Sequence, residues 1–502
     1  MSAQIDLKPE TSWSNAFKIY LNRRVMAMLF LGFSAGLPLF LIFSTLSLWL
    51  REAGVDRSAV TYFSWAALAY SFKFIWAPIV DKLPLPLLHG LLGRRRSWLL
   101  VAQLSVISSI AWMAMVDPAQ GLSGMAVAAV LLGFSSASQD IVIDAYRIEA
   151  VKKEYQAAMS AMYIAGYRIG MLVSGAGGLY LASYFGSGKE YSYSAWQSTY
   201  FVMALVMLIG VFTTLLIKEP EVNEKVETYL HKLSDYLRFF VMFIVMVAAF
   251  IYGFKLFDFG LENGFLNESI RLSTSLVFSL AGIYLLVILN IVNRKMVYST
   301  YLEPVADFFK RYGKAAFLLL LLVGMYRISD IVLGVVANVF YHDLGFSKNE
   351  IATTTKVFGI IMTLVGGFLG GLMTMRYGVM RILLLGAILS ALTNILFMLL
   401  AQMGNDIFML SGVIAADNLS AGLASAAFIA YLSSLTNISF TAVQYAILSS
   451  LMTLFPKLLG GYSGSMVNEL GYSNFFLMTA LIGLPVIFLI YYLMQKKPNI
   501  VK

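Results

Sequence analysis

The sequence predicts an all-α polytopic membrane protein with 14 membrane-spanning helices. Of its 502 residues, 59% are hydrophobic and 13% are charged, whereas soluble domains carry about 25% charged residues. Apolar stretches of about 20 residues, the length with which a helix crosses a bilayer, recur along the whole chain. They lie at 25–50, 59–81, 97–116, 121–146, 157–183, 196–217, 237–257, 272–293, 315–341, 350–375, 380–401, 407–431, 442–466 and 474–494.

The distribution of basic residues gives these helices an orientation. If the N-terminus is cytoplasmic, 25 of the 36 Lys and Arg residues fall in cytoplasmic segments, five in outside segments and six within spans. Cytoplasmic loops of membrane proteins carry such an excess of positive charge. The sequence therefore predicts that both termini are cytoplasmic. The net charge of +9 then follows from topology rather than from nucleic-acid binding.

A charge-dense stretch divides the chain. Residues 218–236 hold several lysines and glutamates and are expected to form a cytoplasmic linker. The expected organisation is an N-terminal six-helix bundle (1–217), this linker, two inserted transmembrane helices (237–300) and a C-terminal six-helix bundle (301–502).

The two bundles carry related sequences. The fifth helices of the two bundles align without gaps, so that Arg168 corresponds to Lys457 and Ser174 to Ser463. In transporters, parallel repeats of this kind place the substrate near the membrane midplane, between two rocking halves.

Ionisable side chains fall within the predicted spans. Such a group near the bilayer centre costs about 2.5–3.5 kcal/mol even on the lenient insertion scale, so it faces a partner or a water-filled cavity. Repetition of this cost indicates a protein that handles a charged solute. The residues are Lys73, Asp140, Asp144, Arg168, Lys255, Arg327, Asp330, Lys356, Asp417 and Lys457.

Asp140 and Asp144 lie at the end of the fourth span. Their i,i+4 spacing puts both carboxylates on one helical face, and Arg147 follows three residues later. Two acids partly removed from water repel each other, which raises the affinity of one of them for a proton. Asp140 is therefore a candidate proton-coupling residue. Alternatively, the acids pair with the basic residues at 94–96 or with Arg147 as a cytoplasmic gate lock, an interpretation that fits Asp144 better.

Arg168 and Lys457 lie at similar depth in their spans. A pair of cations that face each other across a central cavity would suit a substrate with carboxylates. Alternatively, each cation neutralises a neighbouring aspartate. Arg327 and Asp330, spaced i,i+3, form either a self-contained ion pair or contacts with the ligand.

Further candidates lie in other spans. Lys73 is deep in the second span. Lys356, near the outer end of its span, would attract anions at the entrance or extend its amine to the membrane surface. Asp417 and Asn418 form a second polar candidate in the tenth span of the two bundles.

Several kinds of chemistry are not expected. The chain has no cysteine and three scattered histidines, which excludes disulfides, iron–sulfur clusters and a clustered metal site. It contains no Walker-type phosphate loop, nucleophile elbow or HExxH motif, so ATP-driven transport within this chain is not expected. We expect no metal, no cofactor and no nucleic-acid partner.

Two loops resemble those that follow the second helix of each half in the major facilitator superfamily. The first is stretched by Pro84 and Pro86 and matches less well than the second. The residues are Asp81 with Gly93, Arg94, Arg95 and Arg96 in the first loop, and Gly370, Gly371, Arg376 and Arg381 in the second.

Motifs in the first five spans closely resemble the AmpG muropeptide permease family of that superfamily, and the run at 133–175 is the most specific part. The second half shows fainter similarity at Arg327, Lys356 and Asn418. The motifs are Gly36-Leu37-Pro38, Phe72-Lys73-Phe74-Ile75-Trp76 with Asp81, Gly93-Arg94-Arg95-Arg96, Gln139-Asp140 with Asp144, and Gly166-Tyr167-Arg168.

The resemblance implies a fold of two six-helix bundles, here with two extra helices, in the inner membrane of a Gram-negative bacterium. It implies import of N-acetylglucosaminyl-1,6-anhydro-N-acetylmuramyl peptides by the proton motive force, for peptidoglycan recycling and, in some species, β-lactamase induction. Such a ligand has sugars for aromatic and amide contacts and carboxylates for the cations. Two departures are the place of the extra helices, between the sixth and seventh spans of the bundles, and the lysine at Lys457, where arginine is expected.

From this resemblance and the residue patterns we expect three sets of functional residues in a monomer. Substrate contacts are assigned to Lys73, Gln139, Tyr167, Arg168, Arg327, Lys356, Asn418 and Lys457. Proton coupling is assigned to Asp140, Asp144, Asp330 and Asp417. A cytoplasmic gate is assigned to Asp81, Arg94, Arg95, Arg96, Arg147 and Arg376.

Three alternatives remain open at this point. The chain could carry another anionic solute of the same superfamily, such as acetyl-CoA. It could be a membrane-embedded enzyme of cell-wall metabolism, although it lacks an extramembrane loop with acid–base pairs. It could also be a sensor that binds without transport.

Overall fold

The computed structural model describes residues 18–55, 63, 68–85, 87–187, 191–221, 233–257, 259–260, 264–460 and 462–495, and within them the regular structure is helical. Ten helices in this part of the chain are long and apolar enough to cross a membrane, and two shorter apolar helices cover Phe240–Leu256 and Ser273–Ile288. The predicted number of 14 spans is therefore not confirmed by length and composition. The predicted span 59–81 and most of the linker, at 222–232, lie partly or wholly outside the described residues.

The helices up to residue 216 form one group, which we call the N-half. Asn22 caps its first long helix, because the Asn22 side chain accepts a hydrogen bond from the Arg24 N–H. The elements are α2 (Arg23–Ile42), α3 (Ser44–Glu52), α5 (Leu68–Phe72), η2 (Lys73–Ile75), α6 (Ala77–Lys82), α7 (Leu88–Leu92), α8 (Arg94–Ala114), α9 (Ser123–Glu149), η3 (Lys153–Tyr155), α10 (Gln156–Leu172), η4 (Val173–Gly177), α11 (Gly178–Tyr184), α12 (Tyr193–Val206) and α13 (Leu208–Leu216).

The helices from residue 303 onwards form a second group, the C-half. Two of its helices meet the N-half through polar residues near their ends, as described below. The elements are α17 (Glu303–Tyr312), α18 (Ala315–Met325), α19 (Ile328–Asp343), α20 (Lys348–Ile351), η6 (Ala352–Phe358), α21 (Gly359–Tyr377), α22 (Val379–Met403), α23 (Ile407–Leu435), η7 (Ile438–Phe440), α24 (Thr441–Gly460) and α25 (Ser463–Gln495).

Glycines hold α10, which carries Arg168, directly against α2. A Cβ added at Gly166 would collide with the Leu29 carbonyl oxygen, and one added at Gly32 would collide with the Tyr163 carbonyl oxygen. Small residues let two membrane helices approach with their backbones almost in contact. The glycines therefore fix the depth and direction of the α10 side chains.

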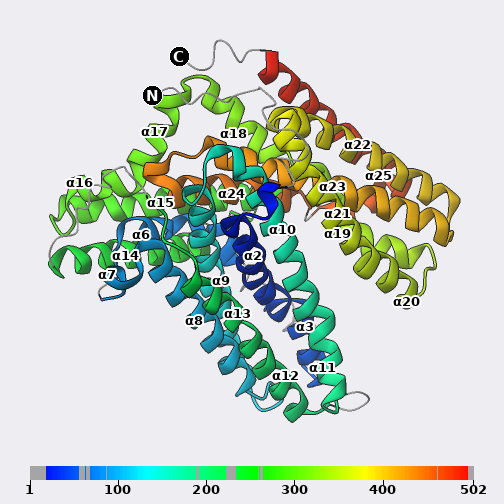
Figure 1. Ribbon diagram of the computed structural model, residues 1–502, viewed down its shortest axis with the longest axis horizontal. Helices are drawn as coiled ribbons and strands as arrows, with labels where there is room; N and C mark the ends of the chain where they lie inside the picture. Colours follow the sequence, from blue (N-terminus) through cyan, green and yellow to red (C-terminus); the bar gives the residue numbers. More distant parts are fainter. Residues whose placement is uncertain are drawn as a thin grey trace.

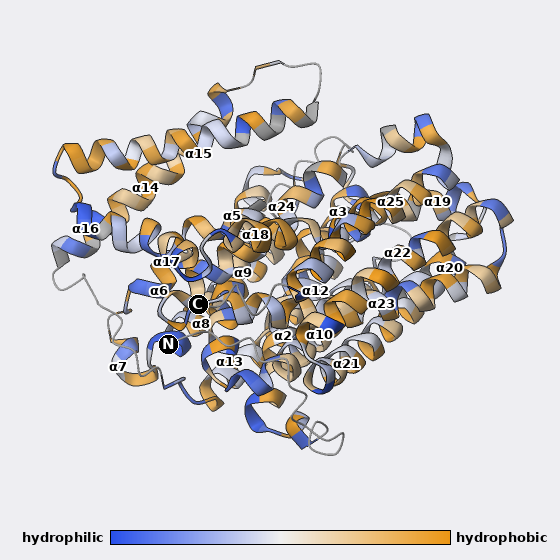
Figure 2. Cartoon of the chain, turned by 90° about the horizontal axis from the view of Figure 1, so that it is seen from above, coloured by the Kyte–Doolittle hydropathy of each residue, from blue (hydrophilic) through white to orange (hydrophobic). Residues whose placement is uncertain are grey.

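Two apolar helices, α14 (Leu233–Leu256) and α15 (Gly264–Ile288), lie at the edge of the molecule (Figure 2). They pack against each other and against the region around η2 and α24, where the Phe250 and Phe72 ring centroids are 5.0 Å apart. Three short elements, α16 (Arg294–Val297), η5 (Tyr298–Leu302) and α17, then lead the chain back to the C-half. In η5, the Tyr301 hydroxyl donates to the Ile75 carbonyl over 3.2 Å.

The two halves meet at one end of the molecule and diverge towards the other. In Figure 1 they run together at the face that carries the start of α2 and the end of α25, which we call the terminal face. Towards the opposite face, α3 and α11 separate from α20. The ribbons of the two halves are therefore closest at the terminal face.

Candidate functional site

A compact cluster of charges lies near the end of α9. The Lys73 amine is 3.4 Å from Asp144 Oδ2, and an Arg147 guanidinium nitrogen is 3.3 Å from Asp144 Oδ1. All three side chains are buried. One carboxylate thus pairs with two cations, and such pairing is what stabilises ionised groups away from water.

Asp140 lies one helical turn before Asp144 on the same face and is also buried. Its Oδ1 atom has no hydrogen-bond partner among the described residues, and neither does either amide atom of the fully buried Gln139. Three tyrosines, Tyr70, Tyr163 and Tyr167, lie within electrostatic range of Asp140. A carboxyl group in this position is chemically able to take up and release a proton, and the amide is free to bind a polar ligand.

Three cations lie deeper, between the halves. Arg168 belongs to no ion pair among the described residues, and its nearest recorded polar contact is the Met171 sulfur at 4.0 Å. Arg327 of the C-half lies within electrostatic range of Arg168. Lys457 is exposed, and its amine donates to the Ser71 hydroxyl of the N-half over 3.3 Å.

Arg327 also has an acidic partner in its own half. Its Nε is 3.4 Å from Asp330 Oδ2, and its guanidinium donates to the Ser425 hydroxyl over 2.5 Å. Asp417 also lies within electrostatic range of Arg327, so the acids of the C-half act on Arg327, whereas Arg168 has no ion pair among the described residues. We call Arg168 and Arg327 the cationic centre; the guanidinium of Arg168 suits an anionic ligand.

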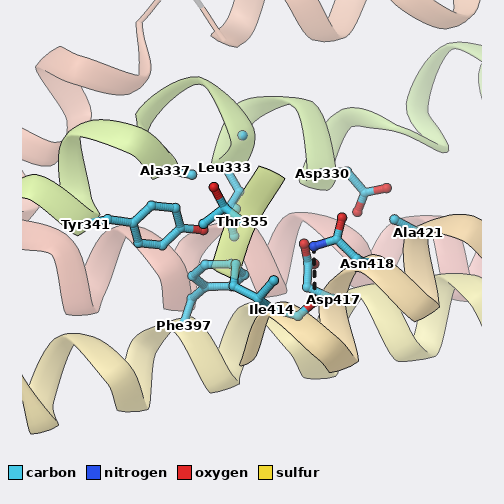
Figure 3. Close-up of a pocket in the computed structure, with 11 residues that line it drawn as sticks. Asp330, Leu333, Ala337, Tyr341, Thr355, Phe397, Ile414, Asp417, Asn418 and Ala421 are labelled. Carbon is cyan, nitrogen blue, oxygen red and sulfur yellow. Dashed lines mark hydrogen bonds between the residues drawn. The ribbon is translucent and has the colours of Figure 1, made fainter. Parts of the chain in front are cut away.

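A cavity of about 200 Å³ lies within the C-half (Figure 3). Asp330, Asp417 and Asn418 line it together with the rings of Tyr341 and Phe397. Local bonds hold the polar groups: the Thr393 hydroxyl donates to Asp417 Oδ1 over 3.1 Å, and the Thr363 hydroxyl donates to Asn418 Oδ1 over 2.9 Å. The Ser390 hydroxyl donates to Asp330. The cavity offers acceptors and aromatic faces beside the cationic centre.

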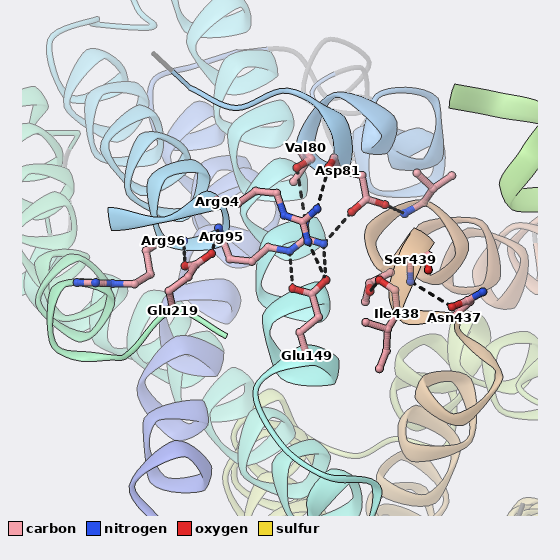
Figure 4. Close-up of polar contacts among 12 residues, drawn as sticks. Val80, Asp81, Arg94, Arg95, Arg96, Glu149, Glu219, Asn437, Ile438 and Ser439 are labelled. Atoms are coloured by element: carbon pink, nitrogen blue, oxygen red, sulfur yellow. Dashed lines mark hydrogen bonds and ion pairs between the residues drawn. The ribbon is translucent and has the colours of Figure 1, made fainter. Parts of the chain in front are cut away.

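A denser network closes the terminal face (Figure 4). The Arg95 guanidinium is 2.7 Å from Asp81 Oδ1 and 2.5 Å from Glu149 Oε1, and only 1% of Arg95 is exposed. The Glu219 carboxylate accepts hydrogen bonds from the Arg95 N–H (2.7 Å) and the Arg96 N–H (3.0 Å), at the start of α8. Carboxylates are stabilised at a helix N-terminus by its free N–H groups and dipole.

This network is joined to the C-half through its acid. Asp81 Oδ2 accepts a hydrogen bond from the Val443 N–H in the first turn of α24, over 3.0 Å. The Arg147 guanidinium likewise donates to the Ser433 hydroxyl, over 2.7 Å, near the end of α23. The Lys82 amine lies 5.2 Å from the centroid of the Phe440 ring. These bridges all lie at helix ends on the terminal face.

The structure brings together many of the residues that the sequence singled out. Asp140, Asp144, Lys73 and Arg147 form one cluster; Asp330, Asp417 and Asn418 share the C-half cavity; Asp81, Arg94 and Arg95 share the network at the terminal face. Arg376 makes contacts in the last turn of α21. The side chain of Lys356 lies outside the described residues.

The gate-lock alternative offered two sets of partners for the α9 aspartates, the basic residues at 94–96 or Arg147, and the structure shows the second for Asp144. The described ion pairs of Arg94 and Arg95 go instead to Glu149 and, for Arg95, Asp81. Asp144 pairs with Lys73 as well as with Arg147. Arg94 and Arg95, at the start of α8, meet the last residue of α9, which lies five positions after Asp144.

The sequence reasoning missed the partners of these groups. Glu149 is the last residue of α9, Glu219 follows three residues after α13, and Ser433 and Val443 carry no charge. The i,i+5 step from Asp144 to Glu149 and the Glu-Pro pair after α13 were the available signals. Neither signal identifies a partner that is more than 50 residues away.

Taken with the fold, these features define a polytopic membrane transporter whose two halves enclose a charged centre. Residues 29–326 and 317–502 match the model of the Major Facilitator Superfamily. The solved structure of the proton:xylose symporter XylE is similar in fold, with a TM-score of 0.56 and 12% identity over 95% of this chain and 96% of that one. The human organic anion transporter MFSD10 gives a TM-score of 0.55, with 14% identity over 93% and 99%.

Sequence relatives are more specific. A putative AmpG transporter of Rickettsia conorii is 32% identical over 480 residues, 95% of this chain and 98% of the relative. The anhydromuropeptide permease of Escherichia coli K12 is 29% identical over 473 residues, 94% of this chain and 80% of the relative. The chain belongs to the major facilitator superfamily and, within it, to the family of AmpG transporters. The resemblance noted in the sequence is confirmed, and the protein is a transporter rather than an enzyme.

Proposed function

We propose that the protein imports anhydro-muropeptides from the periplasm to the cytoplasm by proton symport. The substrate class rests on the Escherichia coli relative, which is named an anhydromuropeptide permease. The observation in this chain that carries the proposal is its cationic centre. Arg168 has no acidic partner among the described residues, and Arg327 faces it from the other half.

The ligand has the chemistry that this centre requires. A muropeptide carries carboxylates on its peptide and hydroxyl and amide groups on its sugars. Arg168, Arg327 and Lys457 bind the carboxylates through charge-assisted hydrogen bonds. Gln139 and the ring of Tyr167 meet the sugars, and the C-half cavity takes a further polar part of the ligand.

Proton coupling is assigned to Asp140. Its buried carboxyl group lies within electrostatic range of Lys73 and Asp144, so its charge state changes the balance of the whole cluster. The excess of Lys and Arg in segments on the side of the termini supports a cytoplasmic terminal face. In that orientation the bridges at the terminal face would close the cytoplasmic side, which is the arrangement of a carrier that loads a substrate from the periplasm. We place the protein in the inner membrane as a monomer.

The test is uptake by the purified protein in liposomes with an imposed inward proton gradient. Labelled anhydro-muropeptide should accumulate uphill, and a protonophore should abolish the accumulation. Arg168→Gln should weaken apparent affinity by about 30-fold or more, because a charge-assisted contact is lost. Arg294→Gln, at an exposed arginine at the start of α16, is the matched control and should leave uptake unchanged.

Two outcomes would overturn the proposal. Absence of entry into vesicles that hold folded protein would exclude muropeptide import. Displacement of bound muropeptide analogue by acetyl-CoA at lower concentration would instead favour another anionic solute of the superfamily.

A further inference from the structure

A line of polar contacts connects Asp140 with the opposite half of the molecule. Lys73 lies within electrostatic range of Asp140 and forms its ion pair with Asp144. Asp144 in turn binds Arg147, whose guanidinium donates to Ser433 of the C-half. Every side chain on this line is buried, so water does not screen the interactions.

The balance of charges along this line depends on whether Asp140 is protonated. Lys73 and Arg147 supply two positive charges, and Asp140 and Asp144 supply two negative charges when both are ionised. A single lysine between two ionised carboxylates is shared by them. When Asp140 takes up a proton from the periplasmic solution, Lys73 has only Asp144 to neutralise. The observed pairing, with Lys73 on Asp144 and Asp140 Oδ1 without a hydrogen-bond partner in the described part of the chain, is the pairing that the relay requires when Asp140 is protonated.

Arg147 is held at the bridge by more than one group. Its guanidinium donates to the Ser160 hydroxyl over 3.0 Å and lies 5.0 Å from the centroid of the Tyr445 ring of the C-half. Tyr163 lies 6.0 Å away on the other side. Once Lys73 neutralises Asp144, Arg147 is drawn less strongly to that carboxylate, and its bonds to Ser433 and Tyr445 are strengthened in comparison.

We infer that Lys73 and Arg147 are positioning residues that transmit the protonation state of Asp140 to the contact between α9 and the C-half. Protonation of Asp140 moves Lys73 onto Asp144 and leaves Arg147 on Ser433, which closes the terminal face. Ionisation of Asp140 draws Lys73 back, Asp144 then holds Arg147 more strongly, and the bridge to the C-half weakens. The inference rests on the proposed role of Asp140 in proton coupling.

The relay would keep the terminal face closed in a carrier that holds a proton but no substrate. Such a carrier does not release its proton at the terminal face, so protons do not leak through it. Other titratable or charged groups also face Asp140 and take part in the same balance. They are Tyr70 of α5, Lys73 of η2, Asp144 of α9, Tyr163 and Tyr167 of α10 and Tyr445 of α24.

The experiment measures the opening of the terminal face directly, without substrate. The chain has no cysteine, so two engineered cysteines carry spin labels without background. Lys153→Cys and Ile438→Cys place the labels at exposed positions of η3 and η7, on the N-half and the C-half. The distribution of distances between the two labels is recorded by double electron–electron resonance in nanodiscs, at pH 5 and at pH 8.

In the protein that carries only the two labelled cysteines (the background protein), the distance between the labels should shift at pH 5 towards the shorter value, which corresponds to the closed terminal face. Asp140→Asn should hold the short distance at both pH values, and Lys73→Gln should remove the pH response, whereas Lys73→Arg should keep it. Ser433→Ala should lower the ratio of short to long distances by about tenfold, because a bond to a charged donor is lost. Ser434→Ala is the matched control, because that hydroxyl donates to the Tyr431 carbonyl of its own helix, and the label distances should not change.

A pH response that survives in Lys73→Gln overturns the relay, as does a response in Asp140→Asn equal to that of the background protein. Loss of the short distance in Ser434→Ala to the same extent as in Ser433→Ala would also overturn it. A failure of the proposed function can be distinguished from a failure of the relay. If muropeptide uptake is absent but the pH response follows the expected order, the substrate assignment falls and the relay stands.

Discussion

The carboxylate of Asp81 caps a helix of the opposite half. Its Oδ2 atom lies 3.0 Å from the backbone nitrogen of Val443, a residue 362 positions away in the sequence. Val443 is the third residue of α24, where a helix N–H has no partner within the helix. The other carboxylate oxygen binds Arg95, so this one acid joins the network of the N-half to the dipole of a C-half helix.

Asp81→Asn should therefore loosen the terminal face. The amide keeps the size of the side chain but loses the charge that attracts both the α24 N-terminus and Arg95. We expect the accessibility of a cysteine introduced at Val443 to a water-soluble thiol reagent to rise by about tenfold. Glu154→Gln, at an exposed acid of η3, is the control and should leave labelling unchanged. Equal labelling in Asp81→Asn and the parent would show that the cap does not hold the halves together.

Loss of the Arg95 charge should destabilise the whole protein. Arg95→Gln leaves Asp81 and Glu149 buried without their shared cation, a change that costs about 3–5 kcal/mol in comparable buried ion pairs. We expect a lower midpoint in thermal unfolding, followed by fluorescence in detergent micelles. Arg381→Gln, which removes an exposed arginine, provides the comparison. A midpoint shift of the same size in both variants would contradict the structural role of Arg95.

The sequence predicts most of the helices because the bilayer imposes a length and a composition on each of them. It predicts the network at the terminal face much less well. Hydropathy does not indicate which acid meets Arg95, and the loop that carries this arginine is the copy that matches the superfamily pattern less closely. The bond from Asp81 to Val443 uses a backbone N–H, which every residue except proline has, so no side-chain pattern could have identified it.

The second span illustrates a different limit. The apolar stretch at 59–81 predicts one continuous helix, but its described part is divided into α5, η2 and α6. The break at Lys73 turns the amine towards Asp144, and Pro78 lies at the start of α6, where the missing N–H costs nothing. Lys73 was expected to contact substrate; the structure pairs it with an acid of α9. Composition cannot reveal this, because the partner lies 71 residues away.

The contact between α2 and α10 should not tolerate a side chain in place of its glycines. Gly166→Ala places a methyl group against the Leu29 carbonyl oxygen, and neither backbone is able to move without displacing Arg168. We expect reduced thermal stability and a loss of transport larger than the loss of folded protein. Gly412→Ala, at a helical glycine with open space around it, should be neutral or slightly stabilising. Normal transport by Gly166→Ala would mean that the two helices separate easily.

Replacement of Asp140 should abolish proton-driven uptake without abolishing substrate exchange. Asparagine has nearly the shape of a protonated aspartate but neither binds nor releases a proton. Asp140→Asn should therefore lose uphill uptake in a proton gradient, because no proton is released on the cytoplasmic side to make the cycle directional. Exchange of labelled for unlabelled substrate should continue, because it requires only the loaded forms of the carrier. Both activities are measured in the same proteoliposomes, with Asp117→Asn in the loop before α9 as the control for a lost carboxylate. Uphill uptake at the parental rate in Asp140→Asn would assign the proton to another acid, and Asp417 in the C-half cavity would be the next to replace.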